Sequence, residues 1–398
     1  MWHDSARHEL CSLEAESFRM LQGFLGARDK LVDAVSDIAT RPSISDELLR
    51  SIRTLAGAPD EILREDPERL SRINVFYPSN NLIYSYVLYV LVPSLYTDTI
   101  TIRPSSRVRR ETARVHEILS PYAAGEVRLW ECSQREFVDD SASVDLVVFT
   151  GTASNAASVR AALRPGPKVL TFASSPTPFV IGPEADVESA ARALVAARLF
   201  NGGQDCLCPD AVFVHTEVRE DLLTCLRTML DRRRSLDSAT SWRMVDGVVY
   251  EDALESACSF IELNRDAVVY GGKCDVDARM IEPTVLMFDW EPDFTPVEMF
   301  APVFCLVEYE DPAQVRTWLN RPDQQRQGSY VSVFGEPQLI DRRIGTIVVV
   351  PEAAPLDVED GNRPFGGYGV EAGAVQCGDE VLGRPLLISA EAARGGRR

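Results

Sequence analysis

A short run before Cys206 carries the clearest chemical signal in the chain. The run FNGGQDC (200–206) follows a helical stretch, and its glycine pair permits a sharp turn before the cysteine. A thiol on such a turn is open to a cleft and acts as a nucleophile where a donor or a dipole favours its thiolate. Taken alone, a cysteine of this kind is more often structural, and the neighbouring Asp205 would raise its pKa. The rest of the chain decides between these interpretations.

Further runs match, in order, the motifs of one protein family. FNGGQDC resembles the catalytic FNxGQxC of the aldehyde dehydrogenase superfamily. The other matches are to PWNFP…P…KPSE, FTGS, PNIVxDDAD, IEPTV, EIFGPV and PFGG. Here they read PSNNL (78–82) with Pro93 and RPSS (103–106), FTGT (149–152), PFVIGPEAD (178–186), IEPTV (281–285), EMFAPV (298–303) and PFGG (364–367). Each motif alone is weak, but seven in register between about residues 74 and 373 are a specific signal.

The resemblance implies a role for each matched residue. Cys206 would attack an aldehyde, or a thioester in the reverse direction, and Asn81 with the backbone N–H of Cys206 would stabilise the oxyanion. Gly151 and Thr152 would open a helix against the cofactor pyrophosphate. Further cofactor contacts would come from Glu298 and Phe300 at the nicotinamide side and Arg103 at the adenine ribose.

These residues also have plain structural interpretations. Asn81 could cap a helix, Glu298 could be a surface carboxylate, and FTGT could be a simple strand-to-helix turn. Only the register of the motifs favours the functional roles. A cysteine hydrolase is a poor alternative, because the nearest histidine, His215, lies inside an expected strand.

One departure from the family pattern bears directly on the reaction. The family's general base is a Glu in an ELGGK motif, 34 positions before the nucleophile, and Phe172 stands there in the run TFASSP (171–176). A carboxylate at this place activates the water that hydrolyses the acyl-enzyme, and a phenyl ring cannot. Family members without this Glu tend to transfer the acyl group to another acceptor or to reduce activated acyl groups.

Three further departures concern the cofactor and the assembly. Ser106 replaces the acidic residue of KPSE while Arg103 stands nearby, which predicts that the protein takes NADP or NAD, with NADP slightly favoured. Ala156 replaces the second glycine of FTGSxxxG, so its methyl group would crowd the approach of the phosphate without necessarily blocking it. The region before Asn74 is short and shows no subunit-bridging hairpin, which leaves a homodimer open.

Apolar runs alternate with helical stretches, which is typical of an α/β fold with parallel sheets. The expected strands are 73–77, 99–103, 126–130, 146–150, 168–172, 211–215, 284–288, 303–309, 331–334 and 346–350. The expected helices are 82–91, 108–119, 153–163, 186–200 and 219–232. We therefore expect a peripheral helical segment (1–72), a Rossmann-like NAD(P)-binding domain (73–171), an α/β catalytic domain with the nucleophile (172–357) and a C-terminal segment with the PFGG loop and tail (358–398).

Composition excludes several other classes of protein. The formal net charge of −19 disfavours a nucleic-acid partner. The uncharged stretch 75–97 is interrupted by Pro78 and Pro93, so it is too short to cross a membrane. The nine scattered cysteines lack a CxxC spacing and the four histidines do not cluster, which disfavours a metal site and favours the reducing cytoplasm.

The sequence therefore predicts an NAD(P)-dependent aldehyde oxidoreductase that works through a thiohemiacetal and thioester on Cys206. Its small-molecule substrate would be an aldehyde or an acyl thioester, and Phe172 favours acyl transfer or thioester reduction over hydrolysis. Two alternatives remain open. Asp205 or Glu298 could activate water in an ordinary dehydrogenase, or the chain could be a non-catalytic scaffold.

Overall fold

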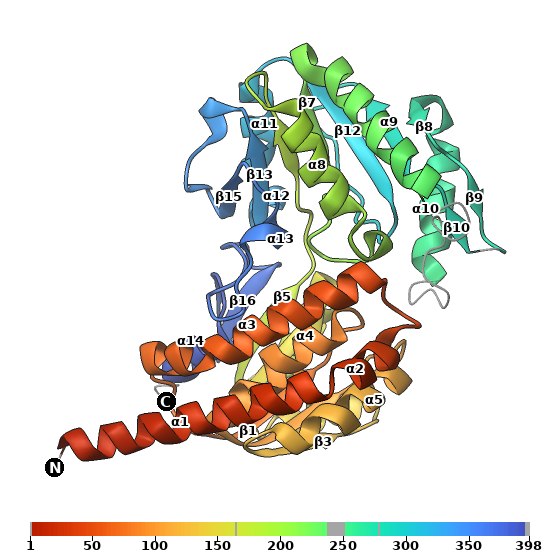
Figure 1. Ribbon diagram of the computed structural model, residues 1–398. Helices are drawn as coiled ribbons and strands as arrows, with labels where there is room; N and C mark the ends of the chain where they lie inside the picture. Colours follow the sequence, from red (N-terminus) through yellow and green to blue (C-terminus); the bar gives the residue numbers. More distant parts are fainter. Residues whose placement is uncertain (1, 164, 237–250, 278, 395–398) are drawn as a thin grey trace. The chain divides into compact units, whose positions relative to one another are not determined.

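The computed structural model describes residues 2–163, 165–236, 251–277 and 279–394. The chain forms two compact units, each with its own sheet (Figure 1). The first unit comprises residues 1–173, 360–366 and 370–398, and the second comprises 174–359 and 367–369. This grouping differs from the expected one, because the helical segment and most of the C-terminal segment belong to the first unit.

The sheet of the first unit has the strand order β17-β16-β5-β4-β1-β2-β3. Strands β1 to β5 are parallel, and the hairpin β16–β17 adds two antiparallel strands beside β5. The strands are β1 (Leu70–Phe76), β2 (Thr97–Arg103), β3 (Glu126–Leu129), β4 (Leu146–Gly151), β5 (Lys168–Ala173), β16 (Gly373–Cys377) and β17 (Glu380–Gly383). The order reverses between β1 and β4, and ligands of such open α/β sheets bind at the carboxyl ends of the strands at this point.

Helices follow these strands as the alternation predicts. They are α4 (Leu82–Tyr86), α5 (Arg109–Leu119), α6 (Gln134–Ser141), α7 (Ala153–Ala162) and α14 (Ile388–Ala393). The helix expected over 82–91 continues beyond α4 as the π-helix η1 (Val87–Leu91), where the N–H of Val92 donates to the carbonyl of Val87. Short π-helical segments of this kind are frequent at functional sites.

The first helices of the chain are not peripheral, contrary to the expectation. They are α1 (Trp2–Gly26), α2 (Arg28–Val35) and α3 (Arg41–Glu65). Two carboxylates of α3 are almost completely buried: Glu47 accepts from the N–H groups of Ile83 and Tyr84, and Glu61 accepts from Asn362. The pattern of α3 is amphipathic, and its buried face closes the core of the first unit.

The sheet of the second unit has the order β14-β15-β13-β6-β7-β12-β11-β8, with antiparallel strands only at its two edges. Its strands are β6 (Phe179–Ile181), β7 (Val212–His215), β8 (Val268–Tyr270), β11 (Thr284–Phe288), β12 (Val303–Tyr309), β13 (Tyr330–Phe334), β14 (Arg343–Ile344) and β15 (Ile347–Pro351), with a separate hairpin β9 (Cys274–Asp275) and β10 (Met280–Ile281). Its helices are α8 (Val187–Arg198), α9 (Arg219–Leu236), α10 (Glu251–Leu263), α11 (Pro312–Leu319), α12 (Pro322–Arg326) and α13 (Pro355–Val358).

Burial on both faces explains why the central strands of each sheet read as nearly continuous apolar runs. In the second unit, α8 and α9 pack on one face through Leu194 and Leu226, and α11 packs on the other through Trp318 (Figure 1). These expected strands and helices are confirmed, with ends shifted by a few residues. His215 ends strand β7, as expected.

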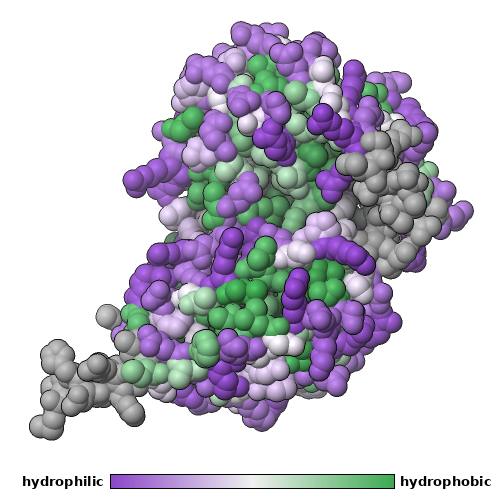
Figure 2. Space-filling view, in the orientation of Figure 1, coloured by the Kyte–Doolittle hydropathy of each residue, from purple (hydrophilic) through white to green (hydrophobic). Residues whose placement is uncertain are grey.

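Apolar side chains also reach the surface of the first unit. Phe18, Leu25, Leu49 and Leu63 on α1 and α3 are each more than 40% exposed, and Figure 2 shows a hydrophobic area on this unit among mostly hydrophilic residues. Within the described ranges, no helix has the length and apolar character needed to cross a bilayer. Nor do His, Cys, Asp and Glu side chains gather there in a group that could hold a metal ion.

Candidate active site

The turn before Cys206 has an unusual backbone. Asn201, Gly202 and Gly203 all have positive φ, at 48°, 67° and 86°. Glycine adopts this conformation freely and asparagine tolerates it, which explains the residue types in the run. The N–H of Gln204 then donates to the carbonyl of Asn201 at 3.2 Å. The chain thus reverses sharply after α8 and presents Cys206, whose side chain is half-buried.

The surroundings of Cys206 disfavour its thiolate. Burial raises the pKa of the thiol well above its usual value, and the negative charges of Asp205 and Glu298 raise it further. Asp205 is itself buried, and its Oδ1 accepts from the N–H of Leu207 at 2.8 Å. Cys206 therefore rests as a thiol, and its attack on a carbonyl requires an acceptor for the proton.

Glu298 is the second carboxylate whose charge raises the pKa of Cys206. Its Oε2 accepts from the hydroxyl of Ser174 at 3.0 Å, whereas its buried Oε1 has no hydrogen-bond partner among the described residues. Burial raises the pKa of Glu298, against the lowering effects of Ser174 and Arg198. Glu298 is thus not an ordinary surface carboxylate. Phe300, two residues on, is also partly buried.

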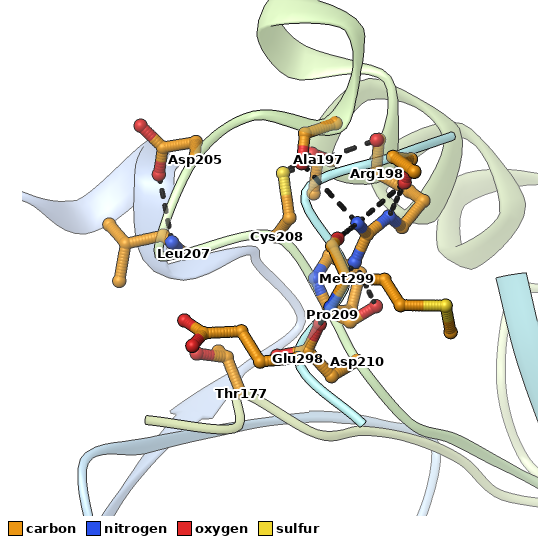
Figure 3. A network of polar contacts seen from close by, with 12 residues as sticks. Thr177, Ala197, Arg198, Asp205, Leu207, Cys208, Pro209, Asp210, Glu298 and Met299 are labelled. Carbon is orange, nitrogen blue, oxygen red and sulfur yellow. Dashed lines mark hydrogen bonds and ion pairs between the residues drawn. The ribbon is translucent and has the colours of Figure 1, made fainter. Parts of the chain in front are cut away.

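A fully buried arginine joins the two segments that carry Cys206 and Glu298 (Figure 3). Arg198, the last residue of α8, donates to the carbonyls of Gly203, Pro209, Met299 and Ala301, and forms an ion pair with Asp210 at 3.2 Å. The same carboxylate oxygen of Asp210 accepts from the N–H of Met299 at 3.2 Å. Burial raises the pKa of Asp210 to about 7, although the nearby Arg198 lowers it.

The other expected site residues lie in the first unit, and several meet at the carboxyl ends of its strands. Gly151 ends β4, and Thr152 caps α7 by accepting from the N–H of Asn155 at 3.4 Å. The Thr150 hydroxyl donates to the carbonyl of Phe76 at the end of β1, at 2.8 Å. The start of α7 therefore lies at the strand-order reversal, where backbone N–H groups favour an anion.

Ala156 does not crowd this helix start, and that expectation was wrong. Its side chain is fully buried and packs in a cluster with Phe76, Phe149 and Val159. The reason is helical geometry: position 156 lies one turn into α7, on the face that packs against the sheet.

Asn81 precedes α4 in the left-handed conformation, with φ of 49°. It occupies the N-cap position, but its side chain makes no cap hydrogen bond. That task falls to Glu47 of α3, whose Oε2 accepts from Ile83 and Tyr84 at 2.9 and 3.2 Å. The structural interpretation of Asn81 as a side-chain cap is therefore wrong, and Glu47 anchors the helix that follows Asn81.

Arg103 ends β2 and is half-buried. Its Nε donates to the carbonyl of Cys132 at 3.2 Å, and within the described part of the chain its Nη1 and Nη2 atoms make no hydrogen bond. Burial lowers the pKa of the Arg103 guanidinium, which nevertheless stays positively charged at neutral pH. The arginine can thus offer two donor groups to an anion such as a phosphate.

Phe172 lies near the end of β5, paired with Thr150 of β4 and Gly373 of β16. Its ring contacts that of Tyr89, on the π-helix η1, with 5.6 Å between ring centroids. Position 172 is thus filled by one member of an aromatic pair, and no carboxylate stands there.

Three residues that hydrogen-bond within these segments were not identified from the sequence. The sequence could have indicated that Arg198 is buried, because this charged residue lies on the apolar face of α8 with Leu194 and Val195. Glu47 likewise lies on the buried face of α3. Ser174 had no such signal, since only the tertiary structure brings it to Glu298.

Known proteins place the chain in a family. The model of the aldehyde dehydrogenase family matches residues 133–369, more than half of the chain, and the chain belongs to this family. The putative aldehyde dehydrogenase AldX of Bacillus subtilis is 27% identical over 249 residues, which are 58% of this chain and 51% of AldX. The chain thus spans about half the length of the curated relatives it matches. Asn81 and Arg103 precede the matched range, so their assignment rests on the motifs.

Solved structures share the fold at low identity. A 3,6-anhydro-L-galactose dehydrogenase has a TM-score of 0.78 at 15% identity, covering 96% of this chain and 86% of the other. An NAD-dependent aldehyde dehydrogenase from Sinorhizobium meliloti has a TM-score of 0.77 at 16% identity, covering 96% and 80%. These likenesses confirm the α/β fold with a Rossmann-like cofactor domain.

Proposed function

We propose that this chain is an NAD(P)-dependent aldehyde oxidoreductase that forms a thiohemiacetal and then a thioester on Cys206, and that it passes the acyl group to an acceptor other than water or reduces an activated acyl thioester to the aldehyde. The observation that carries the second part is the aromatic pair of Phe172 and Tyr89. It occupies the place at which the family's hydrolytic base would stand.

The residues of the second unit account for the start of the reaction. The sulfur of Cys206 bonds to the carbonyl carbon, and its proton passes to a base. Glu298 can accept it through Oε1, because burial raises its pKa and so makes the carboxylate a stronger base than an exposed one. We assign stabilisation of the oxyanion to the N–H of Cys206 and to Asn81, as the motif order implies.

The residues of the first unit fit a dinucleotide. The start of α7, with Gly151 and Thr152, offers a helix N-terminus at the strand-order reversal. Glu298 and Phe300, which belong to the second unit, are assigned to the nicotinamide side, as the motifs imply. When bound, the nicotinamide supplies the hydride acceptor or donor.

We propose that Arg103 directs the preference towards NADP. Its two unused Nη groups suit the 2′-phosphate, and Ser106 brings no repelling charge. In Arg103→Gln, the dissociation constant of NADPH should rise about tenfold, while that of NADH changes little. Isothermal titration of both cofactors tests this. Tighter binding of NADH by the unchanged protein would refute the preference.

Hydrolytic oxidation is the second candidate. It is favoured by the buried Oε1 of Glu298, which has no hydrogen-bond partner among the described residues, and by the raised pKa of this carboxyl. Asp205 is a weaker candidate base, since its Oδ1 already accepts from Leu207. If Glu298 activates water, the acyl-enzyme turns over without an added acceptor. A scaffold without activity need not bind a cofactor at all, so absence of binding in the same titration would favour the scaffold alternative.

The deciding experiment follows the mass of the intact protein after mixing with NADP⁺ and a panel of aldehydes. We expect one equivalent of NADPH, a stable acyl adduct, and then a stall. Cys206→Ala should abolish the adduct, whereas Cys208→Ala, which removes a buried thiol bonded to the carbonyl of Ala197, should retain it. Steady turnover without an adduct would favour hydrolysis.

Phe172→Glu tests the role assigned to the aromatic pair. If the missing carboxylate limits deacylation, this variant should lose the stall and release the acid, with a rate gain of about 10²-fold. Phe172→Gln, which removes the ring but adds no base, is the matched control and should keep the stall. Equal behaviour of the two variants would refute the proposal.

A further inference from the structure

We propose that Arg198 is a positioning residue that sets Cys206 against Glu298 by clamping their two segments to each other. This inference rests on the proposed function only for its kinetic consequences, because its geometry stands by itself. None of the family motifs quoted above includes Arg198.

The guanidinium spans three segments of the second unit. Nη2 donates at 3.3 Å to the carbonyl of Gly203, in the turn formed by residues 200–206, which we call the nucleophile turn. It also donates to the carbonyls of Met299 and, at 2.6 Å, of Ala301, both just after Glu298. Nη1 reaches the carbonyl of Pro209, after the nucleophile, at 2.9 Å. One side chain thus holds the backbone on both sides of Cys206 and just after Glu298.

The backbone contact beneath the arginine is equally close. A Cβ atom on Gly203 would lie 2.4 Å from the carbonyl oxygen of Ala301 and 2.9 Å from the nitrogen of Pro302. The nucleophile turn therefore packs directly on the segment that carries Glu298 and Phe300. Converging carbonyl oxygens would repel one another there, and the guanidinium supplies the donors that hold them together.

Asp210 completes the clamp. It pairs with Arg198 and accepts from the N–H of Met299, so it fixes the same segment from its other side. Lysine cannot replace this arrangement, because a single ammonium group lacks the planar fork that reaches carbonyls in different directions. Arg198→Lys keeps the charge opposite Asp210 and loses the clamp.

The test compares Arg198→Lys and Arg198→Gln with Tyr309→Phe. The last variant removes a buried hydroxyl that donates to Glu336 in the same unit, away from the turn. The first readout is alkylation of Cys206 by iodoacetamide at pH 8, followed by site-resolved mass spectrometry. The buried Cys305 reports on unfolding in the same sample.

Loosening the turn exposes Cys206 and separates it from Glu298, and both changes speed alkylation. We expect its rate to rise at least about fivefold in both Arg198 variants, with Cys305 protected and Tyr309→Phe unchanged. If Arg198→Gln does not fold, Arg198→Lys alone decides. Protection of Cys206 equal to that in Tyr309→Phe would overturn the proposal.

The second readout is steady-state or burst kinetics with NADP⁺ and an aldehyde. Misplacement of reacting groups should lower kcat or the burst rate about 10²-fold with little change in KM, and only in the Arg198 variants. If the unchanged protein shows no aldehyde-dependent NADPH formation, the proposed function fails while the alkylation result still judges the clamp. Faster alkylation with unaltered kinetics would overturn the positioning role.

Discussion

Two glycine turns of this molecule are built in different ways. The turn after β4 (residues 149–152), which we name the cofactor turn after its proposed role, is held by a helix cap and by one bond to the adjacent strand: Thr152 accepts from Asn155, three residues on, and the Thr150 hydroxyl donates to the carbonyl of Phe76 at the end of β1. The nucleophile turn, after α8, is held by Arg198 bonds to Met299 and Ala301, more than 100 residues away in sequence. The cofactor turn is thus held within one pair of adjacent strands and its own helix, whereas the nucleophile turn depends on the segment that carries Glu298, about 100 residues away.

This contrast has a functional consequence. A helix N-terminus needs only the right backbone to attract a phosphate. In the proposed mechanism Cys206 needs its proton acceptor, Glu298, at a set distance, and the two residues come from different segments. The proposed clamp by Arg198 would then lie where relative position matters for the chemistry.

The largest effect should be a difference in unfolding free energy between alanine variants of two adjacent glycines, Gly202 and Gly203. Gly203→Ala combines an unfavourable positive φ with a clash against Ala301, whereas Gly202→Ala has only Gln204 Nε2 at 3.8 Å in its way. We expect Gly202→Ala to cost about 1 kcal/mol of unfolding free energy and Gly203→Ala about 2 kcal/mol more. Urea unfolding measures both. Equal losses of unfolding free energy in the two variants would contradict the contrast between the two turns, because the nucleophile turn would then not depend on its contact with Ala301.

A second, comparable effect should appear in the pH dependence of stability. Burial raises the pKa of Asp210 from 3.8 to about 7, so the folded protein holds this proton more tightly than the unfolded chain. The contribution of Asp210 is therefore greatest below pH 4 and is lost as pH rises towards 7, by a few kcal/mol at most.

Asp210→Asn should remove this part of the slope. Urea unfolding of both proteins between pH 4.5 and 8 gives the difference. Parallel curves would show that the carboxylate is stabilised by Arg198 well enough to keep an ordinary pKa. The two turns differ in this respect, because the cap bond of the cofactor turn is made by the neutral hydroxyl of Thr152, which does not titrate in this pH range.

The smallest effect should be at the cofactor turn. Thr152→Ala removes one helix cap, which costs about 1 kcal/mol of stability. The alkylation rate of Cys206 should not change, because the hydrogen bonds of Thr152 join it to Ser154 and Asn155 in its own helix. Thr152→Ser, which keeps the hydroxyl, is the control and should restore the cap. A change in Cys206 alkylation in Thr152→Ala would contradict the independence of the two turns.

Much of the fold followed from the sequence because its signals are local. The parallel strands were visible as short apolar runs, and their ends fell within a few residues of the structure, as for Leu146–Gly151 and Thr284–Phe288. The nucleophile turn was visible in its glycines. The burial of α3 was missed because its polar composition hid two buried carboxylates, Glu47 and Glu61, whose partners lie in other elements.

The sequence by itself determined the order of elements, the family, the candidate nucleophile and the absence of a carboxylate at position 172. Each of these depends on residue type and spacing along the chain. Only the tertiary structure decided that Ala156 faces the core, that Phe172 pairs with Tyr89, and that Arg198 joins the segments of Cys206 and Glu298. The physical reason is that such contacts join residues far apart in the chain, and their geometry exists only once the sheets and helices have packed.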